Sequence, residues 1–258
     1  MTEYYLDINV DTGEGYGRYR VASFSDEDVF KYATSINLAT GFHAGDPTIM
    51  WSTVKAAKKY NLGIGAHPGL QDLRGFGRRR ILIDPEDLKA DLIYQIGALD
   101  AFLKIEGVRM QHVKPHGALY VMAEQDAAYA EAIVEAVALY NPELILITER
   151  GTEVWRKAQS KGLKVVAEAF PDLAYDPNGR IIIERVKKAW DPDLVAKRAL
   201  MVVKEKKIDT IEGKKIDMDV QTICIHGDAP NAPDVIKRVR EVLENEGVKL
   251  VRLSEIVK

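Results

Sequence analysis

The chain has 258 residues, of which 47% are hydrophobic and 29% are charged. Its 36 basic and 39 acidic side chains leave a net charge of −3, which excludes the strongly basic character of proteins that bind nucleic acids or anionic membranes. No apolar run approaches the ~20 residues of a membrane-spanning helix, and the acidic, strand-like N-terminus lacks the features of a signal peptide. We therefore expect a cytoplasmic protein.

Short apolar segments alternate along the chain with longer amphipathic ones. Strands are predicted at 4–10, 35–39, 62–66, 110–114, 144–148, 163–169, 221–226 and 249–253. Helical patterns occupy the intervals between them. This alternation predicts βαβ units and a parallel sheet, and seven or eight such units favour a closed or nearly closed (β/α) barrel over an open doubly wound sheet.

Local signals predict where some of these elements begin. Asp-Pro pairs stand before three helical patterns, at 46–47, 84–85 and 191–192. The aspartate accepts hydrogen bonds from free N–H groups of the first turn, and proline fits the position after it. The sequence Asp176-Pro177-Asn178-Gly179 predicts a turn, and hence a hairpin inserted near 170–184. With that exception, 1–258 is expected to form a single barrel domain.

Polar residues interrupt the first predicted strand at every second position. Asp7, Asn9 and Asp11 share one face of it, and Glu14 follows among glycines. An exposed strand face would explain this pattern without any function. Barrel strands, however, are buried on both sides, so polar groups on them need partners or a ligand. We interpret the four residues as part of a functional site.

All five histidines lie in predicted strands or directly after them. The residues concerned, with their polar neighbours, are His43 and Asp46, His67 and Asp72, His112, Lys114 and His116, and His226 and Asp228. Because active residues of a (β/α) barrel collect at the carboxyl ends of its strands, these groups are predicted to converge at one mouth of the barrel.

Structural roles remain open for several of these residues. Asp46 is either a helix N-cap or a ligand, and His112 is interpreted as a core residue or a support for the site. His226 and Asp228 are functional or hold the last loop. The run from Arg78 to Arg80 is typical of a solvated turn, although Arg78 follows a Gly-Phe-Gly loop suited to gripping an anion. Cys224, the single cysteine, is expected to be an inert buried thiol.

Two kinds of chemistry fit this residue set. Aspartate and histidine bind divalent metals, and three such ligands with one open position would activate a water molecule. Without a metal, the same side chains would serve as general base and general acid. Lys114 and an arginine would then hold a carboxylate or a developing oxyanion. Either mechanism predicts hydrolysis, or ring opening, of a small polar anion.

Six segments resemble a known family at these same residues. They are DINVDTGEGYG, NLATGFHAGDP, GAHPGLQDLRGFGRR, VKPHGALY, EAFPDLAYDPNGR and ICIHGDAP, which follow one another between residues 7 and 230. Together they are similar to the LamB/YcsF family. The resemblance implies an α/β fold, a distorted (β/α) barrel with seven or eight mainly parallel strands, related to the barrels of glycoside hydrolases and polysaccharide deacetylases.

The resemblance also implies a function. It implies ATP-dependent opening of 5-oxo-L-proline to L-glutamate together with partner subunits B and C, which activate the lactam with ATP. By similarity the expected site residues are Asp7, Asn9, Asp11, Glu14, His43, Asp46, His67, Lys114, His116, His226 and Asp228. Their roles are our own hypotheses: we expect catalytic roles for Asp7, Asn9, Glu14, His67, Lys114, His116, His226 and Asp228. In the same hypothesis, Arg78 and Lys114 bind the cofactor, and Asp11, His43 and His67 bind a divalent metal. The ATP expected as cofactor is held either by this chain or by the partner subunits.

The sequence departs from the family pattern at several positions. Thr40 follows Ala39 where members commonly have cysteine, Val121 replaces an asparagine, and Pro171 and Leu173 alter an Ala-Asp-Arg motif. Two other functions also stay open. One is a self-sufficient metal-dependent deacetylase or amidohydrolase acting on a small polar substrate. The other is a non-catalytic, substrate-binding partner of an ATP-using subunit.

Overall fold

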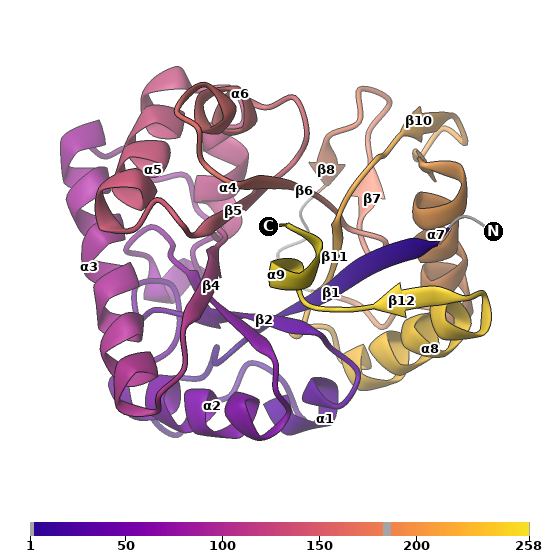
Figure 1. Cartoon of the computed structure of the whole chain (residues 1–258), viewed down its shortest axis with the longest axis horizontal. Coiled ribbons are helices and arrows are strands. Elements are labelled where there is room, and N and C mark those ends of the chain that lie inside the picture. Colours follow the sequence, from indigo (N-terminus) through magenta and orange to yellow (C-terminus); the bar gives the residue numbers. More distant parts are fainter. Residues whose placement is uncertain (1–2, 183–186, 258) are drawn as a thin grey trace.

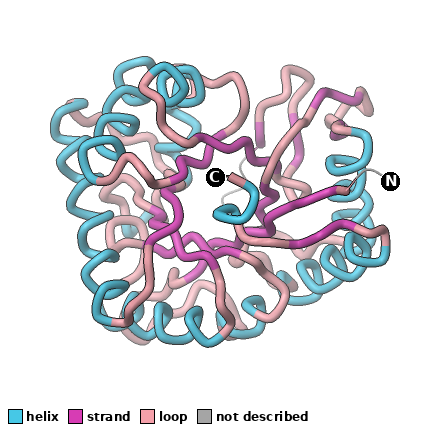
Figure 2. Tube along the Cα trace, viewed as in Figure 1, coloured by secondary structure: helices cyan, strands magenta, loops and turns pink. Residues whose placement is uncertain are grey.

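A ring of parallel strands forms the centre of the molecule, and helices surround it (Figures 1 and 2). The computed structural model describes residues 3–182 and 187–257. Within these residues the ring contains β1 (Tyr4–Thr12), β2 (Ser35–Ala39), β3 (Gly63–His67), β4 (Met110–Val113), β5 (Ile145–Thr148), β6 (Val165–Ala169) and β11 (Thr222–Ile225). Strand β11 pairs with both β6 and β1, which closes the ring. The predicted barrel is thereby confirmed.

An eighth parallel strand lies outside the ring. Strand β12 (Val248–Leu250) pairs with the first residues of β1, from Tyr4 to Leu6. The predicted last strand, 249–253, is therefore placed too far along the chain, because Leu253 begins the short helix α9 (Leu253–Ile256). Helix α9 covers one end of the barrel, where Leu253 packs against Ile145 and Val166 at the beginnings of β5 and β6. The opposite end, formed by the carboxyl ends of the strands, is left for polar residues.

The helices follow the strands as the alternation predicts. They are α1 (Asp26–Phe30), α2 (Pro47–Lys59), α3 (Pro85–Ile105), α4 (Gly117–Ala123), α5 (Ala127–Tyr140), α6 (Glu153–Ser160), α7 (Pro192–Glu205) and α8 (Ala232–Asn245), with a 3-10 turn, η1, at Leu73–Gly75. Asp46, Asp84 and Asp191 are the N-caps of α2, α3 and α7, each followed by proline. Of the two roles considered for Asp46, the structure thus shows the N-cap. No helix in the described ranges is long and apolar enough to cross a membrane.

The helices pack on the barrel through apolar stripes. In α3, Leu92, Ile96, Leu99 and Leu103 are at most 1% exposed, so their shared face is fully covered. Burial of one such side chain contributes about 1.5–3 kcal/mol to stability. The main core joins these helices to the strands, and it holds the barrel together from the outside.

Two small hairpins interrupt the alternation. Strands β7 (Ala174–Tyr175) and β8 (Ile181–Ile182) pair antiparallel, and Asp176 accepts hydrogen bonds from the N–H groups of Asn178 and Arg180 in the turn between them. This is the hairpin expected near 170–184, of which residues 183 and 184 lie outside the described ranges. A second antiparallel pair, β9 (Lys207–Asp209) and β10 (Lys215–Asp217), was not predicted, because its alternating charges carry no apolar signal.

Candidate active site

Four polar side chains meet at the carboxyl end of the barrel, around the carboxylate of Asp11. Asp11 belongs to β1 and His67 ends β3, while Lys114 follows β4 and His226 follows β11. Oδ1 of Asp11 lies 3.5 Å from Nε2 of His67 and 3.3 Å from Nζ of Lys114, and Oδ2 lies 4.0 Å from Nε2 of His226. Residues at the ends of strands far apart in the sequence thus lie close together in the structure.

Lys114 is held in this mouth by negative charge. Its Nζ lies 3.1 Å from Oε1 of Glu168 and 3.3 Å from Oδ1 of Asn9, and the residue is only 2% exposed. Burial by itself would lower the pKa of the ammonium, but the nearby carboxylates, Asp11 above all, raise it well above the usual value. Lys114 is therefore a charged, oriented cation with carboxylate partners.

Asp11 remains an anion despite its burial. Burial would raise the pKa of its carboxyl group, but Lys114 and His67 hold that pKa well below the usual value. The amide Nδ2 of Asn37 donates a hydrogen bond of 2.7 Å to Oδ1. Glu168 differs, because burial raises its pKa to about 7 in spite of the attraction of Lys114. The two carboxylates beside Lys114 thus favour different protonation states near neutral pH.

His226 is oriented by a buried aspartate. Its Nδ1 lies 3.0 Å from Oδ2 of Asp172, and the same oxygen accepts a 2.9 Å hydrogen bond from the backbone N–H of His226. Burial opposes ionisation of Asp172, yet His226 and Lys187 lower its pKa to about 2. An ionised Asp172 accepts only, so Nδ1 of His226 carries a proton, and Nε2 is the nitrogen that faces Asp11.

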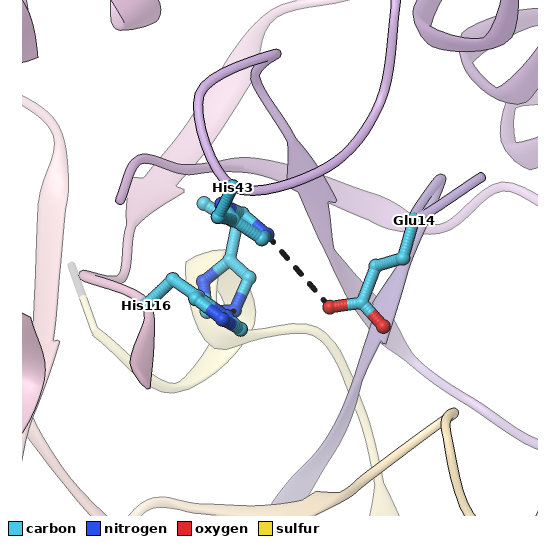
Figure 3. A group of neighbouring side chains, drawn as sticks. Glu14, His43 and His116 are labelled. Atoms are coloured by element: carbon cyan, nitrogen blue, oxygen red, sulfur yellow. Dashed lines mark hydrogen bonds and ion pairs between the residues drawn. The ribbon is translucent and has the colours of Figure 1, made fainter. Parts of the chain in front are cut away.

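Three imidazole rings lie together beside this group (Figure 3). His43 stacks on His116 with ring centroids 3.7 Å apart, and His67 meets His116 edge to face. Nε2 of His67 and Nδ1 of His116 are 2.9 Å apart. Burial lowers the pKa of His43 and of His116 well below the usual value, so both rings are held neutral.

Glu14 completes this cluster from the loop after β1. Its side chain is 9% exposed, and Oε1 lies 3.8 Å from Nε2 of His43, the contact drawn in Figure 3. Burial, with the negative charges of Asp11 and Asp228, raises the pKa of Glu14 well above the usual value. The loop can turn here because Gly13 adopts a positive φ of 69°.

Arg78 reaches the mouth from the loop after β3. Its Nη2 lies 2.6 Å from Oδ2 of Asp228, and its side chain is 9% exposed. Arg79 differs, since its half-exposed guanidinium pairs with the buried Asp72 on the outside. The three consecutive arginines therefore do not form one solvated turn. Arg78 joins the site, whereas Arg79 and Arg80 do not.

Two cavities border Asp11. The smaller, of about 40 Å³, lies in the mouth itself, and its wall combines the charged groups of Arg78, Lys114 and Lys187 with the ring of Phe170. The larger, of about 440 Å³, lies between the loop at 20–25 and helices α1 and α2, with Glu14 at its edge. We assign the chemistry to the smaller cavity, because most of the polar groups described above line it: Asp11, His67, Arg78, Lys114, His116 and His226.

Asp7, another residue of the predicted site, lies deeper in the barrel. It is four residues before Asp11, about 13 Å along the strand. It accepts hydrogen bonds from the hydroxyl groups of Ser35, Thr34 and Thr222, and burial raises its pKa to about 6. The structure therefore places Asp7 in the barrel interior, away from the mouth.

Asn9 and His112 support the mouth from below. Asn9 donates to Glu168 at 2.8 Å and accepts from Asn37 at 2.6 Å, and Nε2 of His112 lies 2.7 Å from Oδ1 of Asn37. His112 is fully buried, as its interpretation as a core or supporting residue implies.

Cys224 is buried too, and burial raises the pKa of its thiol well above the usual value, which fits an inert side chain.

Sequence reasoning missed Glu168, Asp172 and Asn37. Glu168 stands in VVAEAF, where one carboxylate interrupts an apolar strand, the same signal that singled out Asp11. Asp172 follows the end of that strand, within the resembling segment EAFPDLAYDPNGR. Neither has a histidine beside it in the sequence, so the pattern of histidines at strand ends does not reveal them. Asn37 lies within the predicted strand 35–39, where it carries no such signal either.

Comparison with known proteins extends over the whole chain. The model of the LamB/YcsF family matches residues 6–258. A protein of Clostridium beijerinckii named as the A subunit of 5-oxoprolinase is 45% identical over 98% of this chain and 99% of its own length. A protein of the same name from Thermus thermophilus is 46% identical over 95% of this chain and 98% of its own length. Another, from Pyrococcus abyssi, is 44% identical over 98% of this chain and 99% of its own length.

Solved structures agree with this relationship. The crystal structure of the lactam utilization protein from Thermus thermophilus is 43% identical, with a TM-score of 0.87 over 96% of this chain and 99% of the other. A putative cellobiose-phosphate cleavage protein from Enterococcus faecalis, 12% identical with a TM-score of 0.56 over the full length of both chains, shares the fold alone. From the match over residues 6–258 and these whole-length relatives, we conclude that the chain belongs to the LamB/YcsF family.

Proposed function

We propose that this chain is the A subunit of an ATP-dependent 5-oxoprolinase. In this role it opens the lactam ring of 5-oxo-L-proline to give L-glutamate, together with partner subunits B and C. The observation that carries the proposal is the similarity, over nearly the whole length of both chains, to several proteins named as the A subunit of 5-oxoprolinase. A self-sufficient deacetylase and a non-catalytic binding partner lack comparable support.

The polar groups of the mouth match the demands of lactam cleavage. Water must be deprotonated as it adds to the ring carbonyl, and His226, held by Asp172, presents its Nε2 lone pair to the mouth for this purpose. The addition places negative charge on the carbonyl oxygen or on a group attached to it. The ammonium of Lys114 is the oriented cation that would stabilise that charge.

The substrate also carries a carboxylate that does not react. Arg78 lines the same cavity and has a planar guanidinium suited to a carboxylate. We assign the binding of the substrate carboxylate to Arg78, beside its partner Asp228. A cavity of about 40 Å³ has room for only a few water molecules, so 5-oxo-L-proline would widen the mouth by displacing side chains of its wall.

The proposed use of ATP follows from the stability of the lactam. Transfer of the γ-phosphoryl group to the ring carbonyl oxygen would make the ring carbon more electrophilic. Water then adds, the ring C–N bond breaks with its electron pair going to nitrogen, and a second water releases phosphate from the acyl phosphate. Because the sequence has no Walker-type loop, we assign ATP binding to subunits B and C, and we place the reaction in the cytoplasm, where ATP is supplied.

The test is glutamate release from 5-oxo-L-proline and ATP by three mixtures: this chain alone, subunits B and C alone, and all three together. We expect glutamate only from the complete mixture. No glutamate from the complete mixture, with ATP still consumed by B and C, would contradict the proposed substrate.

A pair of lysine variants separates catalysis from assembly. Lys114→Met should lower kcat at least 100-fold while the three chains still assemble. Lys161→Met is the matched control, because Lys161 is a half-exposed C-cap of α6. Helices of the barrel run antiparallel to the strands, so this position lies at the end opposite the mouth. Full activity of Lys114→Met would exclude the role given to Lys114.

A further inference from the structure

The hydrogen bonds of His67 and His116 leave two lone pairs facing each other. Nδ1 of His67 lies 2.7 Å from the carbonyl oxygen of Lys114, and Nε2 of His116 lies 2.8 Å from the carbonyl oxygen of Phe76. A carbonyl oxygen only accepts, so each of these nitrogens carries a proton, and in the singly protonated form that can bind a metal the lone pair lies on the other ring nitrogen. Nε2 of His67 and Nδ1 of His116 are then both acceptors, at a separation of 2.9 Å. Two acceptors at this distance need a cation or a proton between them.

This pattern is the one that metal-binding histidines have in proteins. A ligating imidazole commonly donates its other N–H to a backbone carbonyl or a carboxylate, which fixes the tautomer and the direction of the free lone pair. His67 and His116 both have such a carbonyl partner. The backbone therefore orients the two lone pairs toward the same space.

His43 faces the same space without a hydrogen-bond partner. Its side chain is 0% exposed, and neither of its ring nitrogens has a hydrogen-bond partner among the described residues. A buried polar group without a partner is costly, by about 1–3 kcal/mol, so in a native protein such a group is normally satisfied by an ordered water or an ion. The nearest carboxylate oxygen, Oε1 of Glu14, is 3.8 Å from Nε2.

The separations between these atoms fit a single ion. One ligand atom from each of Glu14, His43, His67 and His116 can be chosen so that all four lie within 4.8 Å of one another. Bonds of about 2.0–2.1 Å to a tetrahedral zinc ion place neighbouring ligand atoms about 3.3 Å apart. Small side-chain rotations would therefore bring the four atoms into position. Asp11, 3.5 Å from Nε2 of His67, supplies negative charge beside the ion, Glu14 would bind the ion after losing its proton, and the charge of Arg78 is paired with Asp228.

We propose that Glu14, His43, His67 and His116 form a site for one divalent transition-metal ion of the kind that imidazole binds, such as Zn²⁺. The ligands expected from the sequence are Asp11, His43 and His67. The proposed set retains His43 and His67, omits Asp11, and adds Glu14 and His116. Asp11 lies instead in a second group, with Cys224 and His226. Asp11 there already contacts Lys114 and accepts from Asn37, so fewer of its lone pairs remain for a metal.

The experiment measures metal binding by the isolated, metal-free chain with Zn²⁺, Co²⁺ or Mn²⁺ alone. Equilibrium dialysis gives the stoichiometry and affinity, and the visible absorption of bound Co²⁺ reports the ligand set. We expect one ion per chain. Glu14→Gln and His43→Ala should each weaken binding at least tenfold and change the Co²⁺ spectrum. Cys224→Ala is the matched control and should leave both unchanged, because it alters only the second group.

Each outcome decides the proposal. No stoichiometric binding of any of the three ions by the wild-type chain would overturn it, and the facing nitrogens of His67 and His116 would then share a proton. Unchanged binding by Glu14→Gln, or loss of binding in Cys224→Ala, would also overturn it. Glu14→Gln preserves the size of a side chain that stands in a loop, so it remains informative if His43→Ala fails to fold. Because the readout is binding, it is independent of whether the chain acts on 5-oxo-L-proline.

Discussion

Nδ1 of His226 lies 3.0 Å from Oδ2 of Asp172, although the two residues are 54 positions apart in the chain. The first follows β11 and the second follows β6, two strands that are neighbours in the barrel. An aspartate in this relation fixes the imidazole tautomer and stabilises the imidazolium that forms when the ring takes a proton. The pair is the basis for assigning His226 as the base of the proposed reaction.

Replacement of Asp172 by Asn should lower kcat by at least about 100-fold with little change in KM for 5-oxo-L-proline. The amide can donate to Nδ1 and so favours the wrong tautomer of His226. Steady-state kinetics of the complete three-subunit mixture measure the effect. Asp84→Asn is the control, since asparagine caps a helix about as well as aspartate. Wild-type kcat in Asp172→Asn would remove His226 from the proposed chemistry.

Arg78 and Arg80 provide a test of substrate binding within one short run. Arg78→Gln should raise KM for 5-oxo-L-proline at least tenfold and change kcat less, because the guanidinium is proposed to bind the unreactive carboxylate. Arg80 is exposed, and Arg80→Gln should leave both constants unchanged. A fall in kcat alone in Arg78→Gln would show that the residue acts on the reacting atoms instead.

Two carboxyl groups outside the mouth, the buried Glu124 and the half-buried Glu149, predict a pH dependence of stability. Burial raises the pKa of Glu124 to about 7, and burial together with Glu124 raises the pKa of Glu149 well above its usual value. Between the usual pKa of 4.5 and about 7, the unfolded chain has lost the Glu124 proton while the folded chain still holds it. The contribution of Glu124 to the free energy of unfolding therefore falls as pH rises through this window.

The variant Glu124→Gln should remove the part of this dependence that comes from Glu124. Relative to wild type, its free energy of unfolding should rise between pH 4.5 and 7 by up to about 3 kcal/mol. Urea unfolding at several pH values measures the difference, with the exposed Glu212→Gln as control. Stability curves of wild type and Glu124→Gln that run parallel across this window would contradict the prediction.

Gly65 and Gly97 should respond in opposite directions to the same substitution. A Cβ atom on Gly65 would overlap the imidazole ring of His112 inside the barrel, so Gly65→Ala should destabilise the fold by about 1–3 kcal/mol or more. Gly97 lies within α3, where the nearest atom is 3.7 Å from such a Cβ, and Gly97→Ala should stabilise by up to about 1 kcal/mol. Urea unfolding measures both. Equal stability of Gly65→Ala and wild type would show that His112 does not occupy that space.

Local patterns were sufficient to predict the barrel and the general position of the site. The strands and helices follow from the periodicity of apolar side chains, and the caps at Asp46, Asp84 and Asp191 follow from residue type alone. That polar strand ends converge is a property of any parallel barrel. The positions of Asp11, His67, Lys114 and His226 at one mouth could therefore be expected without a structure.

Distances along a strand and across the closed ring decided which polar side chains lie at the mouth and which of them contact one another. Asp7 and Asp11 share one pattern in the sequence, but four residues of strand separate an interior aspartate bound by hydroxyl groups from the anion at the mouth. Glu168 reaches Asn9 across 159 positions only because β11 closes the ring between β6 and β1. The sequence by itself determined which segments form the strands of the ring and, to within two residues, where each of them ends. Only the tertiary structure decided which side chains are partners, because register and side-chain direction depend on closure of the barrel.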